Sequence, residues 1–359
     1  MSRSRKKPSW QFCGLGRNEI SAAAAPQSAA PSRWKRTLPG LLISLAALVA
    51  LFLIIDPRQT WQALLQADPL FLLLGMLVTL VWLVVRGRVW QTLLQRKAKY
   101  SDVFLTLNEG YLLNNLLPFR LGEVGRAYLL GRKAGLGFWQ VLPSVVLERM
   151  FDLMMAAGLF ILTLPYVAGV DWAAQAAVIT GGLVGLGLLS VYLVARNQPR
   201  VTGWLERLGG RWPWVQKLVG DRLSAFFAGL QVLTDPRSFL RALAWILFNW
   251  VLSILLYYVF LRAFFSPTPL LWAVFVLGAG SFGVAAPSSP GALGVFEAAL
   301  VGALTVGFKV DPSPATAFAI ALHLSNYINT GLIGGYALLR EGETLSSLYS
   351  QLGRLKSRA

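Results

Sequence analysis

Six ionisable residues stand at short, regular spacing beside apolar runs of the chain, where charge is costly. They are Arg120, Glu123, Arg126, Glu148, Arg149 and Asp152. Spacings of three and four residues place Glu123 with Arg126, and Glu148 with Asp152, on shared helix faces. Arginine suits phosphate because its planar guanidinium group makes bidentate contacts. The pattern predicts a polar cavity for a phosphate-bearing headgroup, and the alternative is an ion-pair network that only locks helices together.

Two segments, 114–126 and 278–297, interrupt the apolar pattern with proline and glycine. Each contains a Pro-x-x-x-Gly step, Pro118 to Gly122 and Pro290 to Gly294, and an acidic residue follows each step. One such break in each half of a membrane chain is typical of a transporter's binding site. The alternative is a simple turn between two helices. The further candidate binding residues at the breaks are Asn115, Ser288, Ser289, Pro290, Gly291 and Glu297.

The single histidine, His323, lies inside the last apolar run, and Asn326 and Tyr327 share its helix face. A proton relay between His323 and Glu297 is one interpretation, and the preferred one is hydrogen bonding between helices. Asn249, in an earlier apolar run, is expected to be a packing residue. Because the chain has one cysteine, Cys13, and one histidine, chemistry that needs two histidines or a cysteine metal site is excluded.

The elements that must position these residues are transmembrane helices. The chain of 359 residues is 55% hydrophobic and 14% charged, with a mean hydropathy of +0.57. Apolar runs long enough to cross a bilayer recur along it, which predicts an all-α, polytopic membrane protein with about eight spans. Residues 103–117 are expected to form a re-entrant or broken helix. The expected spans cover about 38–55, 69–85, 142–165, 173–195, 238–262, 270–286, 292–308 and 314–339.

The charge pattern predicts the orientation. The net charge of +17 lies in tails and short loops, as the positive-inside rule expects, so no nucleic-acid partner is predicted. Arg86 is taken as one of the residues that mark the inner end of the second span. Both termini are placed in the cytoplasm of an inner-membrane protein. The expected non-membrane parts are a disordered basic tail (1–37), an amphipathic loop with Trp204, Trp212 and Trp214 (196–237), and a tail (341–359).

Together, three motifs resemble one family. They are N-x-L-L-P-x-R-x-G-E-x-x-R (114–126), E-R-x-x-D (148–152) and G-x-x-A-P-S-S-P-G-x-L-G-x-x-E (283–297). The combination resembles the lysylphosphatidylglycerol synthase transmembrane family, also called flippase-like membrane proteins, over about residues 38–340. The resemblance implies lipid handling, with the motif residues lining a headgroup cavity. Because the chain stops at Ala359, the aminoacyl-transferase activity of the best-known members is not expected here.

Three functions follow as hypotheses. The first is a transporter or flippase for an anionic or modified phospholipid, a polyprenyl-linked sugar or a hopanoid-type lipid. The second is a membrane transferase with a lipid-linked donor, for which Asp56 and Asp68 are the carboxylate candidates, although each sits beside proline like a cap. The third is an accessory scaffold for a lipid-modifying enzyme. No cofactor motif or metal-binding motif is found, and without a Walker A loop ATP hydrolysis is not expected.

Overall fold

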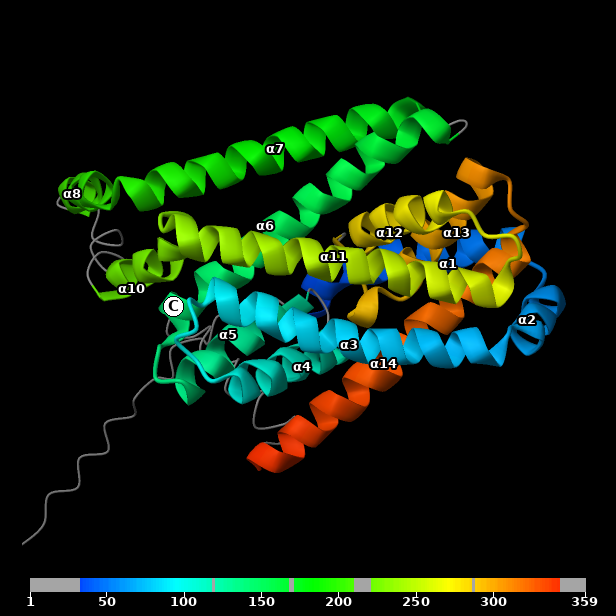
Figure 1. The fold of residues 1–359 in the computed structure, drawn as a ribbon, viewed down its shortest axis with the longest axis horizontal. Coiled ribbons are helices and arrows are strands. Elements are labelled where there is room, and N and C mark those ends of the chain that lie inside the picture. The colour runs from blue at the N-terminus through cyan, green and yellow to red at the C-terminus, as the bar shows by residue number, and fades with distance from the viewer. Residues whose placement is uncertain (1–32, 118–119, 168–170, 210–220, 286–287, 343–359) are drawn as a thin grey trace, which may run out of the picture. The chain divides into compact units, whose positions relative to one another are not determined.

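The computed structural model describes residues 33–117, 120–167, 171–209, 221–285 and 288–342. The chain divides into two units, residues 1–36 and 37–359, and the second unit holds the helical bundle. Every regular element in the described residues is a helix (Figure 1). The expected all-α class is therefore confirmed. Residues 1–32 and 343–359 of the expected tails, and Trp212 and Trp214, lie outside the described residues, whereas residues 33–37, expected in the disordered tail, begin α1.

The helices have the following bounds. They are α1 (Arg33–Ile54), α2 (Pro57–Gln66), α3 (Pro69–Leu93), α4 (Tyr100–Leu116), α5 (Leu121–Lys133), α6 (Phe138–Thr163), η2 (Leu164–Tyr166), α7 (Asp171–Arg196), α8 (Gln198–Gly209), α10 (Asp221–Leu230), η3 (Gln231–Leu233), α11 (Pro236–Phe264), α12 (Leu270–Ala285), η4 (Pro290–Ala292), α13 (Val295–Phe308) and α14 (Pro312–Glu341).

Four helices begin with the same local signal, an aspartate cap followed by proline. The caps are Asp56 for α2, Asp68 for α3, Asp235 for α11 and Asp311 for α14, and each carboxylate accepts a backbone N–H of the first turn. Proline is tolerated at the first helical position because its missing N–H has no partner there. The expectation that Asp56 and Asp68 look like caps is confirmed.

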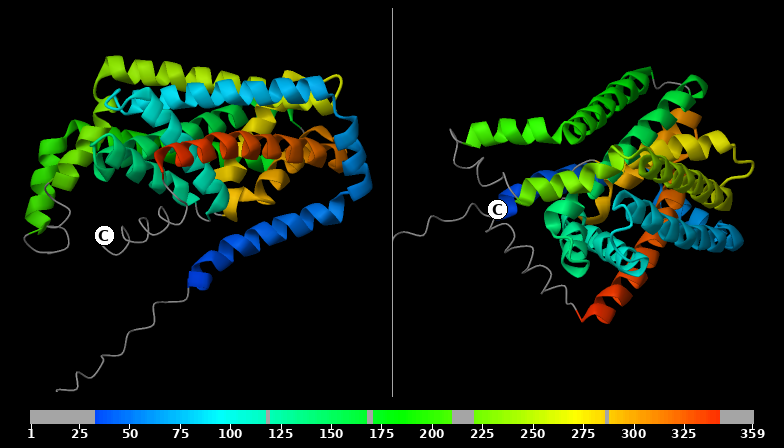
Figure 2. Two further views of the ribbon diagram at one scale, coloured as in Figure 1. Left: turned by 90° about the horizontal axis from the view of Figure 1, so that it is seen from below. Right: turned by 60° about the vertical axis from the view of Figure 1, so that its left-hand side comes forward.

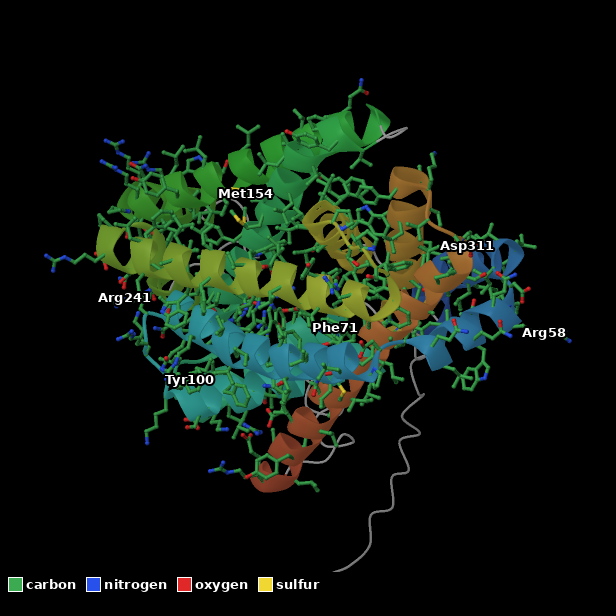
Figure 3. The ribbon with its side chains drawn as sticks, turned by 45° about the vertical axis from the view of Figure 1, so that its right-hand side comes forward. Arg58, Phe71, Tyr100, Met154, Arg241 and Asp311 are labelled. Atoms are coloured by element: carbon green, nitrogen blue, oxygen red, sulfur yellow. The ribbon has the colours of Figure 1, made fainter. Side chains whose placement is uncertain are left out.

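Hydrogen bonds between elements define two ends of the bundle, which we call the α2 end and the α10 end. At the α2 end, Asp56 N–H donates to Ser313 Oγ at 3.2 Å and Asp68 N–H donates to the Ala263 carbonyl at 2.9 Å. At the α10 end, the side-chain amide of Gln95 donates to the Ala228 carbonyl at 3.2 Å. Figure 3 shows Arg58 and Asp311 at the first end and Tyr100 and Arg241 at the second. The helices α3, α11 and α14 each run from one end toward the other.

The break at residues 117–120 turns α4 back into α5 as a helical hairpin, the first hairpin. At its open end Lys133 lies 3.8 Å from Asp102 and pairs with Glu341 of α14. At its tip Asn114 donates to Glu123 at 3.4 Å. The hairpin therefore starts and finishes at the α10 end, which agrees with the expected broken helix. Pro118 itself lies outside the described residues.

The helices α12 and α13 form the second hairpin, which opens toward the α2 end. Trp272 and Phe308 stack at its open end with centroids 5.4 Å apart. At its tip the backbone of Gly291 abuts the hydroxyl of Tyr327, midway along α14. Helices of 16 and 14 residues reach about 24 and 21 Å, less than the ~30 Å of a bilayer core. Counted together with η4, however, Pro290–Phe308 is long and apolar enough to cross a membrane, which agrees with the span expected at 292–308, whereas Leu270–Ala285 is a shorter apolar helix.

The two hairpins enter from opposite ends, and α4 contacts η4 where their tips meet. Among the described helices, three are long and apolar enough to cross a membrane by length and composition: Pro69–Leu93, Pro236–Phe264 and Pro290–Phe308. A fourth arises if Leu42–Ile54 and Pro57–Gln66, bent by 86°, count together; Figure 2 shows this bend between α1 and α2. The total of about eight spans stays a prediction.

Candidate functional site

Glu148 is the centre of a buried charged cluster at the tip of the first hairpin. Its Oε1 accepts hydrogen bonds from Arg86 at 2.6 Å, Arg126 at 3.1 Å and Arg149 at 2.6 Å. Its Oε2 accepts a second bond from Arg126 at 3.2 Å. The side chains of Glu148 and Arg126 are each only 1% exposed. Charges buried this deeply persist only when paired and hydrogen-bonded, and here three arginines share one carboxylate.

Two further carboxylates complete the cluster. Glu123 lies 2.6 Å from Arg126 and 3.7 Å from Arg149. Asp152 accepts two bonds from Arg86, one of them at 2.9 Å, and lies 3.2 Å from Arg149. Three guanidinium groups thus meet three carboxylates with balanced formal charge. We call these six side chains the charged cluster: Arg86, Glu123, Arg126, Glu148, Arg149 and Asp152.

The expectation for Arg86 was wrong. It was assigned to the inner end of a span that stops at Val85, but α3 continues to Leu93 and buries Arg86 at 3% exposure. The helix continues because the arginine finds Glu148 and Asp152 as partners inside the bundle. A sequence signal existed, since Trp82, Arg86 and Trp90 lie four residues apart on one face. The Arg86 guanidinium lies 5.8 Å from the Trp82 ring.

Asn249 was also missed, because it was expected only to pack. Its Oδ1 accepts a bond from Arg86 at 3.2 Å, and its Nδ2 donates to the Trp82 carbonyl at 3.4 Å. Asn249 is 1% exposed and joins α11 to α3 through a polar contact. A single asparagine in an apolar run gives no spacing pattern, so only the fold could assign this role.

Solvent exposure differs across the charged cluster: it is lowest at Glu148, which we call the floor, and higher on the side formed by Arg149 and Asp152. Arg149 is 29% exposed at its side chain and Asp152 is 19% exposed, against 1% for Glu148. Arg120 caps α5 beside this exposed side with a left-handed backbone, φ 52°. Its guanidinium interacts electrostatically with Arg149, which has the same charge, and with Glu123 and Asp152. Within the described residues, Arg120 makes no ion pair at 4.0 Å or less.

The second break positions a separate pair, Glu297 and His323. His323 Nδ1 and Glu297 Oε1 are in direct contact. Glu297 Oε2 accepts the backbone N–H of Gly294 at 2.7 Å, which caps α13. Tyr327 packs its ring 4.8 Å from that of His323. The shared face expected for His323 and Tyr327 is present, whereas Asn326 is exposed.

The other predicted site residues serve as connections between elements. Asn115 donates to Thr330 of α14 at 3.0 Å. Ser289 N–H donates to Ser44 of α1 at 2.9 Å, and Ser288 is buried. Pro290 and Gly291 form the turn η4, where Gly291 has φ 66°. Among the described residues, no ion pair or hydrogen bond joins Glu297 and His323 to the charged cluster.

A comparison with family models decides the identity. Residues 38–334 match the model described as lysylphosphatidylglycerol synthase TM region. This chain belongs to that family. The match covers both hairpins, the charged cluster and the Glu297–His323 pair, so the predicted family is confirmed, and the protein is an integral membrane protein.

Relatives in the lysylphosphatidylglycerol synthase TM family are distant. Glycosyltransferase AglD of Haloferax volcanii is 25% identical over 89% of this chain and 56% of its own length. A UPF0104 membrane protein of Methanothermobacter thermautotrophicus is 24% identical over 85% of this chain and 96% of its own length. This chain therefore spans little more than half of AglD. No solved structure matches.

Proposed function

We propose that this protein moves a lipid with a phosphate-bearing headgroup across the cell membrane, with both of its termini in the cytoplasm. The headgroup passes between the tips of the two hairpins while the acyl chains stay in the bilayer. Two opposed, broken elements that meet inside a membrane protein support this function, because substrate sites of transporters lie at such breaks. Membership of a family named for a lipid synthase points to the same class of substrate.

The observation that carries the proposal is the pair of like charges formed by Arg120 and Arg149. The charged cluster is balanced without Arg120, so Arg120 adds one positive charge at its exposed side. An ionisable group at membrane depth is costly and marks a substrate path by default. An anionic headgroup that lies between the two guanidinium groups would neutralise this excess charge through bidentate contacts.

The structure suits a state in which the path is closed. The six side chains of the charged cluster contact one another directly, and the expected headgroup cavity stays a prediction. Arg149 already shares three carboxylates, Glu123, Glu148 and Asp152. A phosphate can replace one of these partners without leaving the arginine unpaired, because the other two remain. Opening the exposed side therefore costs less than breaking the floor at Glu148.

The experiment is lipid scrambling in proteoliposomes. Purified protein is reconstituted with tail-labelled phosphatidylglycerol or phosphatidylcholine, and the loss of outer-leaflet fluorescence is followed after a membrane-impermeant quencher is added. We expect movement that favours the anionic lipid. Arg120→Gln should slow it by about tenfold or more, since one charge-assisted contact contributes about 1.5–3 kcal/mol. Arg120→Lys retains the charge without the planar guanidinium group. Its rate of lipid movement should lie between those of the unaltered protein and Arg120→Gln.

Asp56→Asn supplies the control and separates the alternatives. Asparagine caps a helix as well as aspartate does, so this variant removes only the carboxylate and should transport normally. Loss of function in Asp56→Asn, with Arg120→Gln active, would support a transferase that uses an outer-face carboxylate, as the name of the relative AglD suggests. Absence of movement of any lipid by the folded protein would contradict transport and favour the scaffold for a lipid-modifying partner enzyme.

A further inference from the structure

A buried acid–base pair lies beside the tip of the second hairpin, and among the described residues no ion pair or hydrogen bond joins it to the charged cluster. Glu297 of α13 and His323 of α14 are 8% and 7% exposed and contact each other through Oε1 and Nδ1. Histidine is the side chain whose ordinary titration lies nearest neutral pH. A carboxylate and an imidazole in contact can exchange a proton along that contact. The pair therefore has the chemistry of a proton-binding site.

The groups around the pair are neutral apart from one weak acid. Tyr327 and Phe296 pack their rings against His323, each with its centroid 4.8 Å away. Tyr327 is the titratable one, and its hydroxyl is buried without a hydrogen-bond partner in the described part of the chain. From α1, the backbone of Ser44 and the side chain of Leu48 approach Gly294.

Charged groups on the other neighbouring helices lie farther along α14. The first hairpin helix α4, which carries Glu109, packs on α14 at Gly334, eleven residues or about 16 Å beyond His323. The cap Asp56 contacts Ser313, ten residues or about 15 Å before it. From α11, Tyr257 approaches α12 at Gly280, behind Phe296. The contacts that carry Glu109 and Asp56 to α14 therefore lie about 15 Å or more along this helix from His323.

The pair also connects the start of α13 to α14. Glu297 holds the start of α13 through the Gly294 N–H and holds α13 to α14 through His323. At the adjacent tip, the backbone of Gly291 lies against the Tyr327 hydroxyl, and the Ser289 N–H donates to Ser44 of α1. Neutralising Glu297 removes the charge attraction between α13 and α14 in a low-dielectric setting, where that attraction is strong. The tip is then free to move off α14.

We propose that the Glu297–His323 pair binds the proton that couples lipid movement to a transmembrane proton gradient. A proton from one side adds to the Glu297 carboxylate, and the adjacent imidazolium then releases its Nδ1 proton to the other side, which leaves Nδ1 vacant. The carboxylic acid returns its proton to Nδ1, which restores the original pair, so one proton crosses per cycle. The inference rests on the proposed lipid transport, to which it adds the energy source.

The test uses the same proteoliposomes with a pH gradient of one unit and the membrane potential clamped. If one proton moves with each lipid, the steady-state ratio of labelled lipid between leaflets should shift about tenfold. Glu297→Gln should abolish this shift and leave symmetric scrambling, because glutamine preserves the cap. His323→Asn, which keeps a nitrogen near the Nδ1 position, should do the same. Glu341→Gln, at the α10 end, should keep the full shift.

Each outcome bears on one claim. Scrambling by the unaltered protein with no response to the gradient overturns the coupling and leaves the transport proposal intact. A full tenfold shift in both Glu297→Gln and His323→Asn shows that the coupling site is elsewhere. If the unaltered protein moves no lipid with or without a gradient, the proposed function fails first and the coupling with it. A dye for internal pH, read in parallel, must show proton entry that both variants lose.

Discussion

At the scale of single residues, the charged cluster depends on partners that come from different helices. Arg86 on α3 reaches Glu148 and Asp152 on α6 and Asn249 on α11. Buried ion pairs contribute little net stability relative to apolar packing, yet losing one partner is severe because the other charge stays buried. The members of the charged cluster should therefore be coupled energetically.

Arg86→Gln tests this coupling. We expect it to lower the free energy of unfolding by about 3–5 kcal/mol, since Asp152 and Glu148 each lose one buried counter-charge. Adding Asp152→Asn should recover part of that loss, which a double-mutant cycle measures directly. Unfolding in mixed micelles is the measurement. Lys133→Gln, in a more exposed pair with Glu341, is the matched control and should cost about 1 kcal/mol or less. Equal losses at both sites would contradict this account.

At the scale of elements, the first hairpin depends on backbones that touch. Gly122 of α5 lies directly against the Gly110 carbonyl of α4, and a Cβ there would also stand 2.6 Å from Asn114 Oδ1. Glycine is needed because any side chain would separate the two helices. This close approach is what brings Glu123 and Arg126, one and four residues later, to Glu148.

Gly122→Ala should therefore destabilise the protein by about 1–3 kcal/mol through overpacking. It should also reduce transport, because the charged cluster would be displaced. Gly158→Ala on α6 is the matched control, since a Cβ there meets nothing within 4 Å. That change should be neutral or stabilising by up to about 1 kcal/mol, as alanine favours helix. Thermal stability in detergent compares the two, and a stable Gly122→Ala protein would contradict the tight hairpin.

At the scale of the whole membrane unit, residues 37–359, the two hairpins open to opposite ends. Cysteines placed at the exposed positions Leu65, Ser266 and Lys309 should react with an impermeant reagent from one side of the membrane. Cysteines at the exposed Ser101 and Thr234 should react from the other side. The background is a Cys13→Ser variant, because Cys13 is the single native cysteine. Labelling of Lys309→Cys from the same side as Ser101→Cys would contradict the placement of the open ends of the two hairpins at opposite ends of the bundle.

The sequence by itself determined the helical class, the membrane environment, the family and five of the six members of the charged cluster. Those features follow from local rules: apolar runs of bilayer length, aspartate–proline helix starts, and i, i+3 and i, i+4 charge spacing. The contact between Glu297 and His323 was among the interpretations, because the chain has one histidine and one acidic residue at the second break.

The tertiary structure decided which distant residues share a site. Arg86 lies 62 residues from Glu148 in the chain, and no local pattern distinguishes an arginine that ends a span from one that is buried against a partner. The same holds for the turn between α12 and α13, whose depth in the bundle cannot be read from the length of the apolar runs on either side. Only the packing of Gly291 against Tyr327 places their turn beside the middle of α14, because the depth of a turn is set by its neighbours and not by its own residues.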